Sequence, residues 1–289
     1  MTKAKALARA KINLTLHVTG QRQDGYHLLD SLVVFADYGD TVSVHEAEGL
    51  TLRISGPKAA GLPGGEDNLV LCAARLAGVS DALITLDKHL PAAAGIGGGS
   101  ADAAATLRAL CISHGAAIPT PEQILELGAD VPICLAGKSL RMGGIGERID
   151  PVPAIPPLPA ILVNPGLAVH TPDVFRALTF RNGTPMPDVP AFSSVADCAK
   201  WLAQQRNDLE GPAMQLCPSI GDCLAALRDQ NAVFARMSGS GATCFGLFKT
   251  PGAARAECHA LRRAHPEWWV QAVILGGEAP EGQSRRDTT

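Results

Sequence analysis

The segment from Leu90 to Leu110 is a glycine-rich loop that runs directly into an alanine-rich stretch, with glycines at positions 95, 97, 98 and 99. Glycine adopts backbone angles closed to other residues and leaves no side chain between the backbone amides and a ligand. A helix predicted to begin at Ser100 would direct its free amides and the positive end of its dipole at the loop. Because each glycine loses extra conformational freedom on folding, this pattern favours a phosphate-binding loop over a plain strand-to-helix turn.

The common nucleotide-binding patterns do not match this loop. A dinucleotide fingerprint fails because its third glycine would fall on Ser100 or Asp102. The triplet Gly137-Lys138-Ser139 resembles the end of a Walker A loop, but Pro132 stands where the first glycine is required, so the triplet is interpreted as a turn. The sequence therefore disfavours a Rossmann oxidoreductase and predicts a phosphate loop of another kind, with no lysine inside it.

Composition is typical of a soluble globular protein, and 289 residues suit two domains or one large one. The content is 46% hydrophobic and 18% charged. A net charge of −3 and a pI near 6.2 argue against binding nucleic acid by phosphate neutralisation. We expect no membrane segment, because no apolar run is long enough to span a bilayer.

Eight cysteines are scattered singly, and none forms a C-x-x-C pair, which argues against a zinc site. We expect them to be small buried hydrophobic residues of a cytoplasmic protein kept reduced. They are Cys72, Cys111, Cys134, Cys198, Cys217, Cys223, Cys244 and Cys258.

The first half of the chain is predicted to be rich in strands. The basic N-terminus has no acidic residue before Asp24 and resembles a targeting peptide. Residues 11–18 instead alternate with period two, which predicts a strand with the apolar residues on one face and Lys11 and Asn13 on the other. Further strands are predicted at 31–36, 41–46 and 82–86, with turns at 24–25 and 38–40. Helices are predicted at 68–77, from 100 onward with Ala103, Leu107, Leu110 and Cys111 on one face, and at 121–127.

The proline cluster at 151–159 predicts neither helix nor central strand and marks a boundary near residue 155. The predicted domains are therefore 1–155 and 156–289. In the second, strands are expected at 160–164, 242–248 and 269–275, helices at 194–205, 220–229 and 252–264, and a proline-rich loop at 172–190. A second glycine loop lies at 238–241, and the tail from Gly276 is expected to fray.

Six motifs occur in one order along nearly the whole chain: Ala10 to Leu14, Gly25 to His27, Asp37 to Asp40, Leu90 to Ala101, Gly128 to Pro132 and Ser238 to Ala242. Together they resemble the superfamily of galactokinase, homoserine kinase, mevalonate kinase and phosphomevalonate kinase. The resemblance implies a two-domain α+β fold, with an N-terminal half like domain 2 of ribosomal protein S5 and a ferredoxin-like C-terminal half. It places the active site in the cleft between them.

The resemblance also implies ATP-dependent phosphorylation of the 2-hydroxyl of a methylerythritol that carries a cytidine diphosphate group, in non-mevalonate isoprenoid precursor biosynthesis. Asp130 would accept the hydroxyl proton, and Lys11 would orient Asp130 and stabilise the transferring group. ATP would come with Mg²⁺, for which the sequence assigns no ligand. The oligomeric state stays open between a monomer and a weak homodimer.

Binding residues follow from the same resemblance. Tyr26 would stack on the cytosine with Phe175 on its other face, His27 would bind the base edge, and Asn13 would contact the substrate. Asn68 and Lys88 would contact adenine. The phosphates would be held by the loop residues Pro91, Ala92, Ala93, Ala94, Gly95, Ile96, Gly97, Gly98, Gly99, Ser100 and Ala101.

Several alternatives stay open at this level. Asp130 before Val-Pro is also typical of a turn or cap, and Lys11 of a solvated strand residue. Asp37 and Asp40 are interpreted as turn formers outside the site. The Ser238 to Gly241 loop could brace the phosphate loop, touch a diphosphate or be a packing turn. The substrate could be homoserine, a mevalonate derivative or a sugar, and the chain could be a silent nucleotide-binding regulator or an RNA-binding module.

Overall fold

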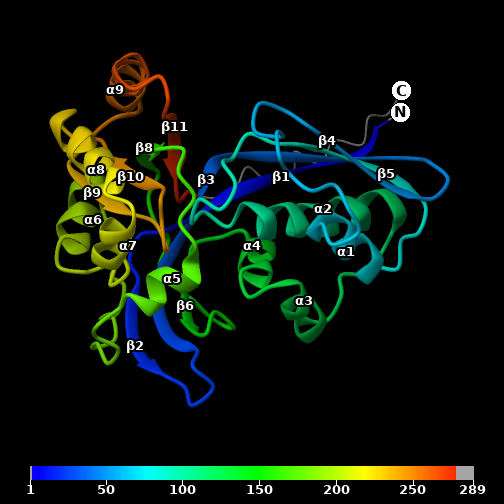
Figure 1. The fold of residues 1–289 in the computed structure, drawn as a ribbon, viewed down its shortest axis with the longest axis horizontal. Coiled ribbons are helices and arrows are strands. Elements are labelled where there is room, and N and C mark those ends of the chain that lie inside the picture. The colour runs from blue at the N-terminus through cyan, green and yellow to red at the C-terminus, as the bar shows by residue number, and fades with distance from the viewer. Residues whose placement is uncertain (1, 278–289) are drawn as a thin grey trace.

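The structure, a computed structural model, describes residues 2–277 and is a two-lobed α+β fold (Figure 1). Its strands are β1 (Thr2–Asn13), β2 (His17–Gln21), β3 (His27–His45), β4 (Leu50–Ser55), β5 (Ala82–Asp87), β6 (Leu140–Gly144), β7 (Arg148–Pro151), β8 (Leu158–Asn164), β9 (Phe234–Met237), β10 (Cys244–Leu247) and β11 (Trp269–Leu275). Its helices are α1 (Leu69–Leu76), α2 (Gly98–His114), α3 (Pro121–Leu127), α4 (Val131–Ala136), α5 (Thr171–Arg176), α6 (Val195–Leu202), α7 (Glu210–Leu216), α8 (Ser219–Asp229) and α9 (Pro251–Ala264).

Strand β3 connects the two lobes. It pairs antiparallel with β1, β2, β5 and β6, and its Ala36 also pairs with Leu275 of β11. The sheet therefore continues in the order β4-β5-β3-β11-β8-β10-β9. Figure 1 shows α1 to α4 in one lobe and α6 to α9 in the other. The expected two-part α+β architecture is confirmed, while the division at residue 155 stays a prediction.

The turn predicted at residues 38–40 is wrong, because these residues continue β3 without interruption. Gly39 pairs with Arg9 of β1, and a Cβ at Gly39 would collide with the backbone of Ala8. Here glycine serves the close approach of two strands, so tertiary pairing overrides the local turn preference. The turn predicted at 24–25 is confirmed, with Gly25 at a φ of 89° between β2 and β3.

The strand predicted over 11–18 is divided. β1 ends at Asn13 and β2 begins at His17, while the amides of Leu14 and Leu16 donate to the carbonyls of Leu32 and Arg206. No face of the segment is open to solvent, because residues 10–18 are all buried. The alternating pattern correctly predicted an extended backbone. It could not predict the interruption between β1 and β2, because the hydrogen bonds of Leu14 and Leu16 go to segments distant in sequence.

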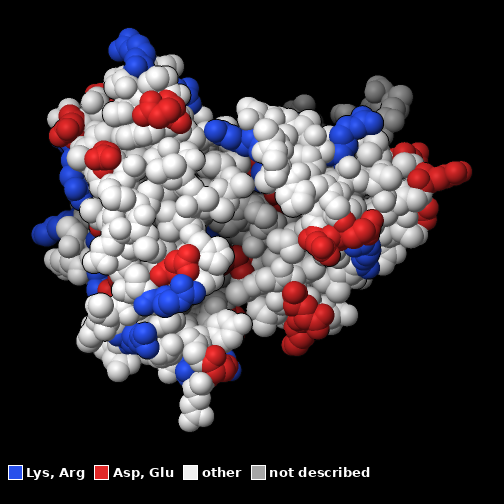
Figure 2. Space-filling view, viewed as in Figure 1, with Lys and Arg blue, Asp and Glu red and all other residues white. Residues whose placement is uncertain are grey.

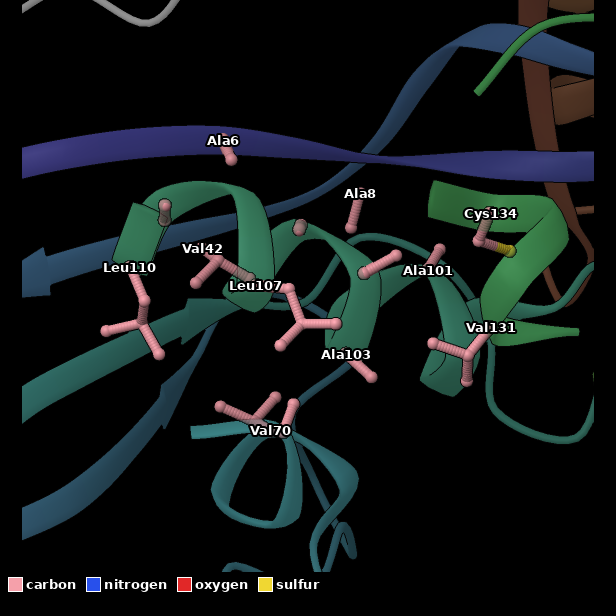
Figure 3. Packing of buried hydrophobic residues seen from close by; sticks show 14 of the residues in the cluster. Ala6, Ala8, Val42, Val70, Ala101, Ala103, Leu107, Leu110, Val131 and Cys134 are labelled. Carbon is pink, nitrogen blue, oxygen red and sulfur yellow. The ribbon is translucent and has the colours of Figure 1, made fainter. Parts of the chain in front are cut away.

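Helix α2 forms the centre of the first lobe. Figure 3 shows Ala103 and Leu107 of this helix between Ala8 of β1 and Val70 of α1. Small side chains on both sides let the helix backbone approach the sheet closely. The helix begins at Gly98, two residues before the predicted start. Cys111, near the C-terminal end of the helix, is exposed and is not buried with Ala103, Leu107 and Leu110 as expected.

The cysteine and proline expectations need two further corrections. Cys72 is only half-buried, whereas the six cysteines from Cys134 onward are buried as expected. Pro159 lies in β8, a central strand, which the proline rule excluded. Pairing of β8 with β10 begins only at Ala160, so the missing N–H of Pro159 leaves no gap in that ladder.

Several other expected elements are confirmed with small shifts, whereas the loop expected over 172–190 begins within helix α5. The helices near 68–77, 121–127, 220–229 and 252–264 and the strands near 82–86, 160–164, 242–248 and 269–275 are present, while the helix expected over 194–205 ends at Leu202. Beyond Gly277 the predicted frayed tail lies outside the described residues. Within residues 2–277 no helix has the length and apolar character needed to cross a membrane.

Candidate functional site

The glycine loop wraps around Lys11 of β1. The Lys11 amide donates to the carbonyl of Ile96 at 2.9 Å, which fastens the loop to the sheet. Gly97 caps α2 with a φ of 65°, and a Cβ there would press on the Lys11 side chain at 3.3 Å. The residues at the start of α2 line the same pocket as the Lys11 side chain. Such an arrangement favours an anion.

The second glycine loop braces the first. A Cβ at Gly95 would lie 2.5 Å from the carbonyl oxygen of Gly241, so the two backbones meet directly. The Ser238 hydroxyl donates to the Gly95 carbonyl at 3.3 Å and accepts from the amide of Asn13 at 3.1 Å. The amide of Thr243 donates to the loop at the Ala94 carbonyl. Of the three readings left open for residues 238–241, bracing is the one that these contacts favour.

Lys11 and Asp130 form an ion pair, with 2.7 Å between Nζ and Oδ2. The Lys11 side chain is only 7% exposed, and the Asp130 side chain is 34% exposed. Asp130 occupies the N-cap position of α4, yet its side chain makes no capping hydrogen bond. Its carboxylate instead pairs with Lys11. The alternative interpretation as a cap residue is therefore correct for its place at the start of α4, but it does not explain what its side chain does.

Three adjoining pockets form one cleft. The central pocket, about 710 Å³, is lined by Lys11, Asn13, Asp130 and the glycine loop. The Tyr26 pocket, about 560 Å³, shares Phe175 and its neighbours at 171–172 with the central pocket. The Lys88 pocket, about 300 Å³, shares residues 98–99 with the central pocket. Figure 2 shows the molecule hollowed between its two lobes.

Most of the expected loop residues line this cleft. Pro91 and Ala92 line the Lys88 pocket, and Ala94 lines the central one. Ile96 and Ala101, in contrast, are buried in two of the hydrophobic clusters and line none of the three pockets. These two residues support the loop from behind, because their side chains point into the protein.

Aromatic side chains gather in the Tyr26 pocket. Tyr26 is 61% exposed, which leaves its ring available for stacking. The rings of His27 and Phe175 stack with centroids 4.8 Å apart, so the partner of Phe175 here is His27. The His27 Nε2 is buried and has no hydrogen-bond partner. Burial, and then the positive charge of Arg181, lower the pKa of His27 and favour its neutral imidazole.

Lys88 is buried in an ionic cluster that sequence reasoning missed. Its Nζ donates to Oδ2 of Asp40 at 2.5 Å and to Oδ2 of Asp102 at 2.7 Å. Asp40 also accepts from the amides of His89 and Leu90, where the glycine loop begins. Asp40 belongs to the motif Asp37 to Asp40, whose local sequence predicts only a turn. Asp40 therefore positions the entry to the loop.

Asn68 and Asp37 make structural contacts. The Asn68 side chain caps α1 by accepting from the amide of Val70 and donates to the carbonyl of Pro63. It also lines the Lys88 pocket. Asp37 accepts from the amide of Ile274 and so fastens β11 to β3. Leaving Asp37 out of the site agrees with this geometry.

Metal ligands are not gathered at one place in residues 2–277, where no group of three or more His, Cys, Asp or Glu side chains could hold an ion. The cleft instead combines the backbone amides of the glycine loop, the buried ammonium of Lys11 and the partly exposed carboxylate of Asp130. This set can bind a phosphate chain, neutralise part of its charge and accept a proton from a second substrate.

Comparison with known proteins gives the family. The family model described as the GHMP kinases N terminal domain matches residues 68–143, and that described as GHMP kinases C terminal matches residues 188–267. GHMP abbreviates the four kinases of the superfamily named above.

Relatives match over almost the full length. The 4-diphosphocytidyl-2-C-methyl-D-erythritol kinase of Dinoroseobacter shibae is 57% identical over 93% of this chain and 93% of its own. That of Ruegeria pomeroyi is 57% identical over 92% of this chain and 96% of its own.

Solved structures agree. A crystal structure of 4-(cytidine 5'-diphospho)-2C-methyl-D-erythritol kinase is 36% identical, with a TM-score of 0.76 over 95% of this chain and 100% of the other. Homoserine kinase from Cytophaga hutchinsonii, 19% identical with a TM-score of 0.65 over 96% of each chain, shares the fold. The chain therefore belongs to the GHMP kinase family, in the group of the 4-diphosphocytidyl-2-C-methyl-D-erythritol kinases.

Proposed function

We propose that this kinase transfers the γ-phosphoryl group of ATP to the 2-hydroxyl of 4-diphosphocytidyl-2-C-methyl-D-erythritol. The products are the 2-phosphate and ADP, and the reaction belongs to non-mevalonate isoprenoid precursor biosynthesis. The observation that carries the proposal is the Lys11–Asp130 pair, which lies in one pocket with the glycine loop. The names of relatives at 57% identity supply the substrate.

ATP occupies two of the adjoining pockets in this proposal. Its phosphates lie in the central pocket, where the loop amides and the N-terminus of α2 stabilise negative charge. Its base lies in the Lys88 pocket, whose walls include the apolar side chains of Leu62, Leu69 and Leu86. Gly98 and Gly99, shared by both pockets, join the two subsites.

Asp130 acts as the general base and Lys11 as its partner. Asp130 accepts the proton of the substrate hydroxyl as the oxygen attacks the γ-phosphorus, a role that contributes about 10²–10⁴-fold in rate. Lys11 orients the carboxylate through their 2.7 Å contact and offers positive charge to the transferring group. Most of the remaining acceleration comes from holding the reactants in line.

The second substrate spans the other two pockets. Its cytosine lies against Tyr26 in the Tyr26 pocket, with His27 at the base edge and Phe175 on the wall shared with the central pocket. Stacking of this kind contributes about 1–3 kcal/mol per base. Asn13 lines the central pocket with an unpartnered Oδ1, which we assign to a substrate hydroxyl.

Mg²⁺ arrives with ATP in this proposal. The cation keeps several waters and is commonly held by substrate phosphates with one or two carboxylates. Asp130 supplies oxygen atoms to the central pocket, and residues 2–277 contain no preformed cluster of acidic ligands. We assign the cation no side-chain ligand. When bound, it would neutralise charge on the ATP phosphates.

We also propose a cytoplasmic location. All eight cysteine side chains are free thiols, and burial raises the pKa of Cys134 and Cys198 to about 12, which keeps these thiols unreactive. Reduced thiols of this kind suit a reducing compartment.

Turnover tests the function directly. Purified protein is incubated with ATP, Mg²⁺ and 4-diphosphocytidyl-2-C-methyl-D-erythritol, and ADP release and the new phosphomonoester are followed by a coupled assay and phosphorus NMR. We expect turnover with this substrate and none with homoserine or mevalonate. Absence of the phosphomonoester at saturating ATP would overturn the proposal, and preference for mevalonate would reassign the substrate.

A further inference from the structure

Asp102 has a buried, unpartnered side-chain oxygen and lines the Lys88 pocket. The residue lies in the second turn of α2, and its side chain is 5% exposed. Its Oδ2 accepts from Lys88 Nζ at 2.7 Å, whereas its Oδ1 has no hydrogen-bond partner. Asp102 is nevertheless part of the pocket lining. Because buried polar atoms are nearly always satisfied, an open position of this kind points to a ligand atom.

The charges around Asp102 do not balance if every group is ionised. Lys88 is shared by two carboxylates, those of Asp40 and Asp102. Asp40 is fully engaged as an anion, because Oδ2 accepts from Lys88 and Oδ1 accepts from the amides of His89 and Leu90. A second ionised carboxylate would leave one uncompensated negative charge in a dry site beside the proposed ATP phosphates. Burying such a charge is strongly unfavourable.

We propose that Asp102 carries a proton on Oδ1 and donates a hydrogen bond from it to the purine base in the Lys88 pocket, so that Asp102 positions ATP for transfer. This inference rests on the proposed function, since it needs a nucleotide in that pocket. Burial raises the pKa of Asp102, Lys88 opposes this rise and Asp40 adds to it, with a result of about 8. The acid form therefore dominates at neutral pH.

The chemistry of the base agrees with a donor at this position. Purine ring nitrogens carry lone pairs and accept hydrogen bonds, which an ionised carboxylate cannot donate. The pocket walls at Leu62, Leu69, Leu86 and Pro91 are apolar and would exclude water from around the bond. Ionisation of Asp102 would replace the hydrogen bond by repulsion between its negative charge and the ring lone pair.

The surrounding titratable groups keep their charge around pH 8. Lys88, after β5, has a raised pKa and remains an ammonium, since its two carboxylate partners outweigh its burial. Cys134 of α4 has a pKa of about 12 and remains neutral. Asp40 of β3 accepts hydrogen bonds from Lys88 and from the amides of His89 and Leu90. Asp67, at the pocket rim, is exposed. A change near pH 8 therefore reports Asp102.

Nucleotide binding without the second substrate provides the test. The dissociation constant of AMP-PNP with Mg²⁺ is measured by calorimetry at pH 7 and pH 9 for the full chain. For the wild type we expect binding to weaken about ten-fold between these values, as the donor is lost. Asp102→Asn should bind within about three-fold of the wild type at pH 7 and show no such weakening, because its amide can accept from Lys88 and still donate.

A second variant and a control complete the experiment. Asp102→Ala should bind about ten-fold more weakly at pH 7, with folding checked by circular dichroism. Asp229→Asn, an exposed position on α8, should retain the wild-type pH dependence. If Asp102→Ala fails to fold, the comparison of wild type with Asp102→Asn decides alone, since a purely structural role would not produce their difference in pH dependence.

The outcomes separate the two proposals. Equal pH dependence in the wild type and Asp102→Asn would overturn the role of Asp102 and leave the kinase assignment intact. The expected pH dependence together with no phosphorylation of the cytidine substrate would overturn the proposed function and keep the nucleotide contact. Failure of the wild type to bind AMP-PNP would overturn both.

Discussion

Lys11 and Asp130 lie 119 residues apart in sequence, yet their side chains meet at 2.7 Å. Lys11 is fixed by its place in β1 and by the hydrogen bond that its backbone amide donates to the glycine loop. Asp130 is fixed by the start of α4, whose Val131 and Cys134 are buried in the same core as α2 (Figure 3). The reacting geometry is therefore determined by how a strand and a short helix pack on one helix.

Replacement of Asp130 by Asn removes the proposed base while preserving its shape. We expect kcat to fall by about 10²–10⁴-fold, with the dissociation constant of AMP-PNP changed less than about three-fold. Steady-state kinetics and calorimetry measure the two quantities. Asp222→Asn, on the exposed surface of α8, is the matched control and should leave both unchanged. An Asp130→Asn enzyme of wild-type kcat would exclude this residue as the base.

Gly95→Ala tests whether the two glycine loops must touch. Gly95 has a φ of 71°, and its added Cβ would meet the Gly241 carbonyl oxygen at 2.5 Å. Gly115→Ala is the control, because Gly115 has a φ of 65° and nothing within 4 Å of the added carbon. Both variants should lose about 1 kcal/mol of stability from the backbone angle. Only Gly95→Ala should also weaken AMP-PNP binding, by about ten-fold; equal effects on binding would contradict the bracing role.

Tyr26→Ala tests the cytosine platform. Tyr26 is 61% exposed and lines the Tyr26 pocket, so its removal leaves no core cavity. We expect KM for the cytidine substrate to rise about ten-fold with KM for ATP unchanged, because stacking is lost from one substrate only. Phe180→Ala is the control, since Phe180 is 63% exposed and lies outside that pocket lining. A matching rise in the Phe180→Ala enzyme would argue against specific stacking by Tyr26.

Asp30→Asn tests a buried ion pair that fixes the segment after α5. Asp30 accepts from Arg141 at 2.7 Å through both oxygens and from the amide of Met186 at 2.8 Å. Burial raises the pKa of Asp30, but the hydrogen bonds from Arg141 and Met186 outweigh it and lower the pKa overall. A lowered pKa in the folded state contributes stability that is present above the unfolded pKa, about 3.9, and is lost as pH falls through the folded value.

The expected result follows from that sign. Asp30→Asn should lower the free energy of unfolding at pH 7 by about 3 kcal/mol and lose less stability than the wild type on acidification, as measured by urea titration. Asp150→Asn breaks an exposed pair with Arg148 and should change stability by less than about 1 kcal/mol. If Asp30→Asn lost no more unfolding free energy than Asp150→Asn, the structural role of the buried pair would be contradicted.

The sequence predicted local structure correctly at several places where hydrogen bonds and backbone angles involve only neighbouring residues. The glycine loop, the helix after it and the turn at Gly25 could be predicted, because backbone angles and helix amides depend on neighbouring residues. Order and identity of the motifs also gave the family, which similarity over nearly the whole chain supports. Pro159 and the residues around Gly39 could not be predicted, since their pairing partners lie far away in sequence.

The sequence by itself determined that this chain has a phosphate-binding loop without a lysine, and which residues carry chemistry. Only the tertiary structure decided how they meet: Lys11 with Asp130, Phe175 with His27, and Lys88 with Asp40 and Asp102. These contacts depend on the packing of separate elements into one cleft. Hydrophobic burial drives that packing, and its geometry is specified by the whole core and not by any motif.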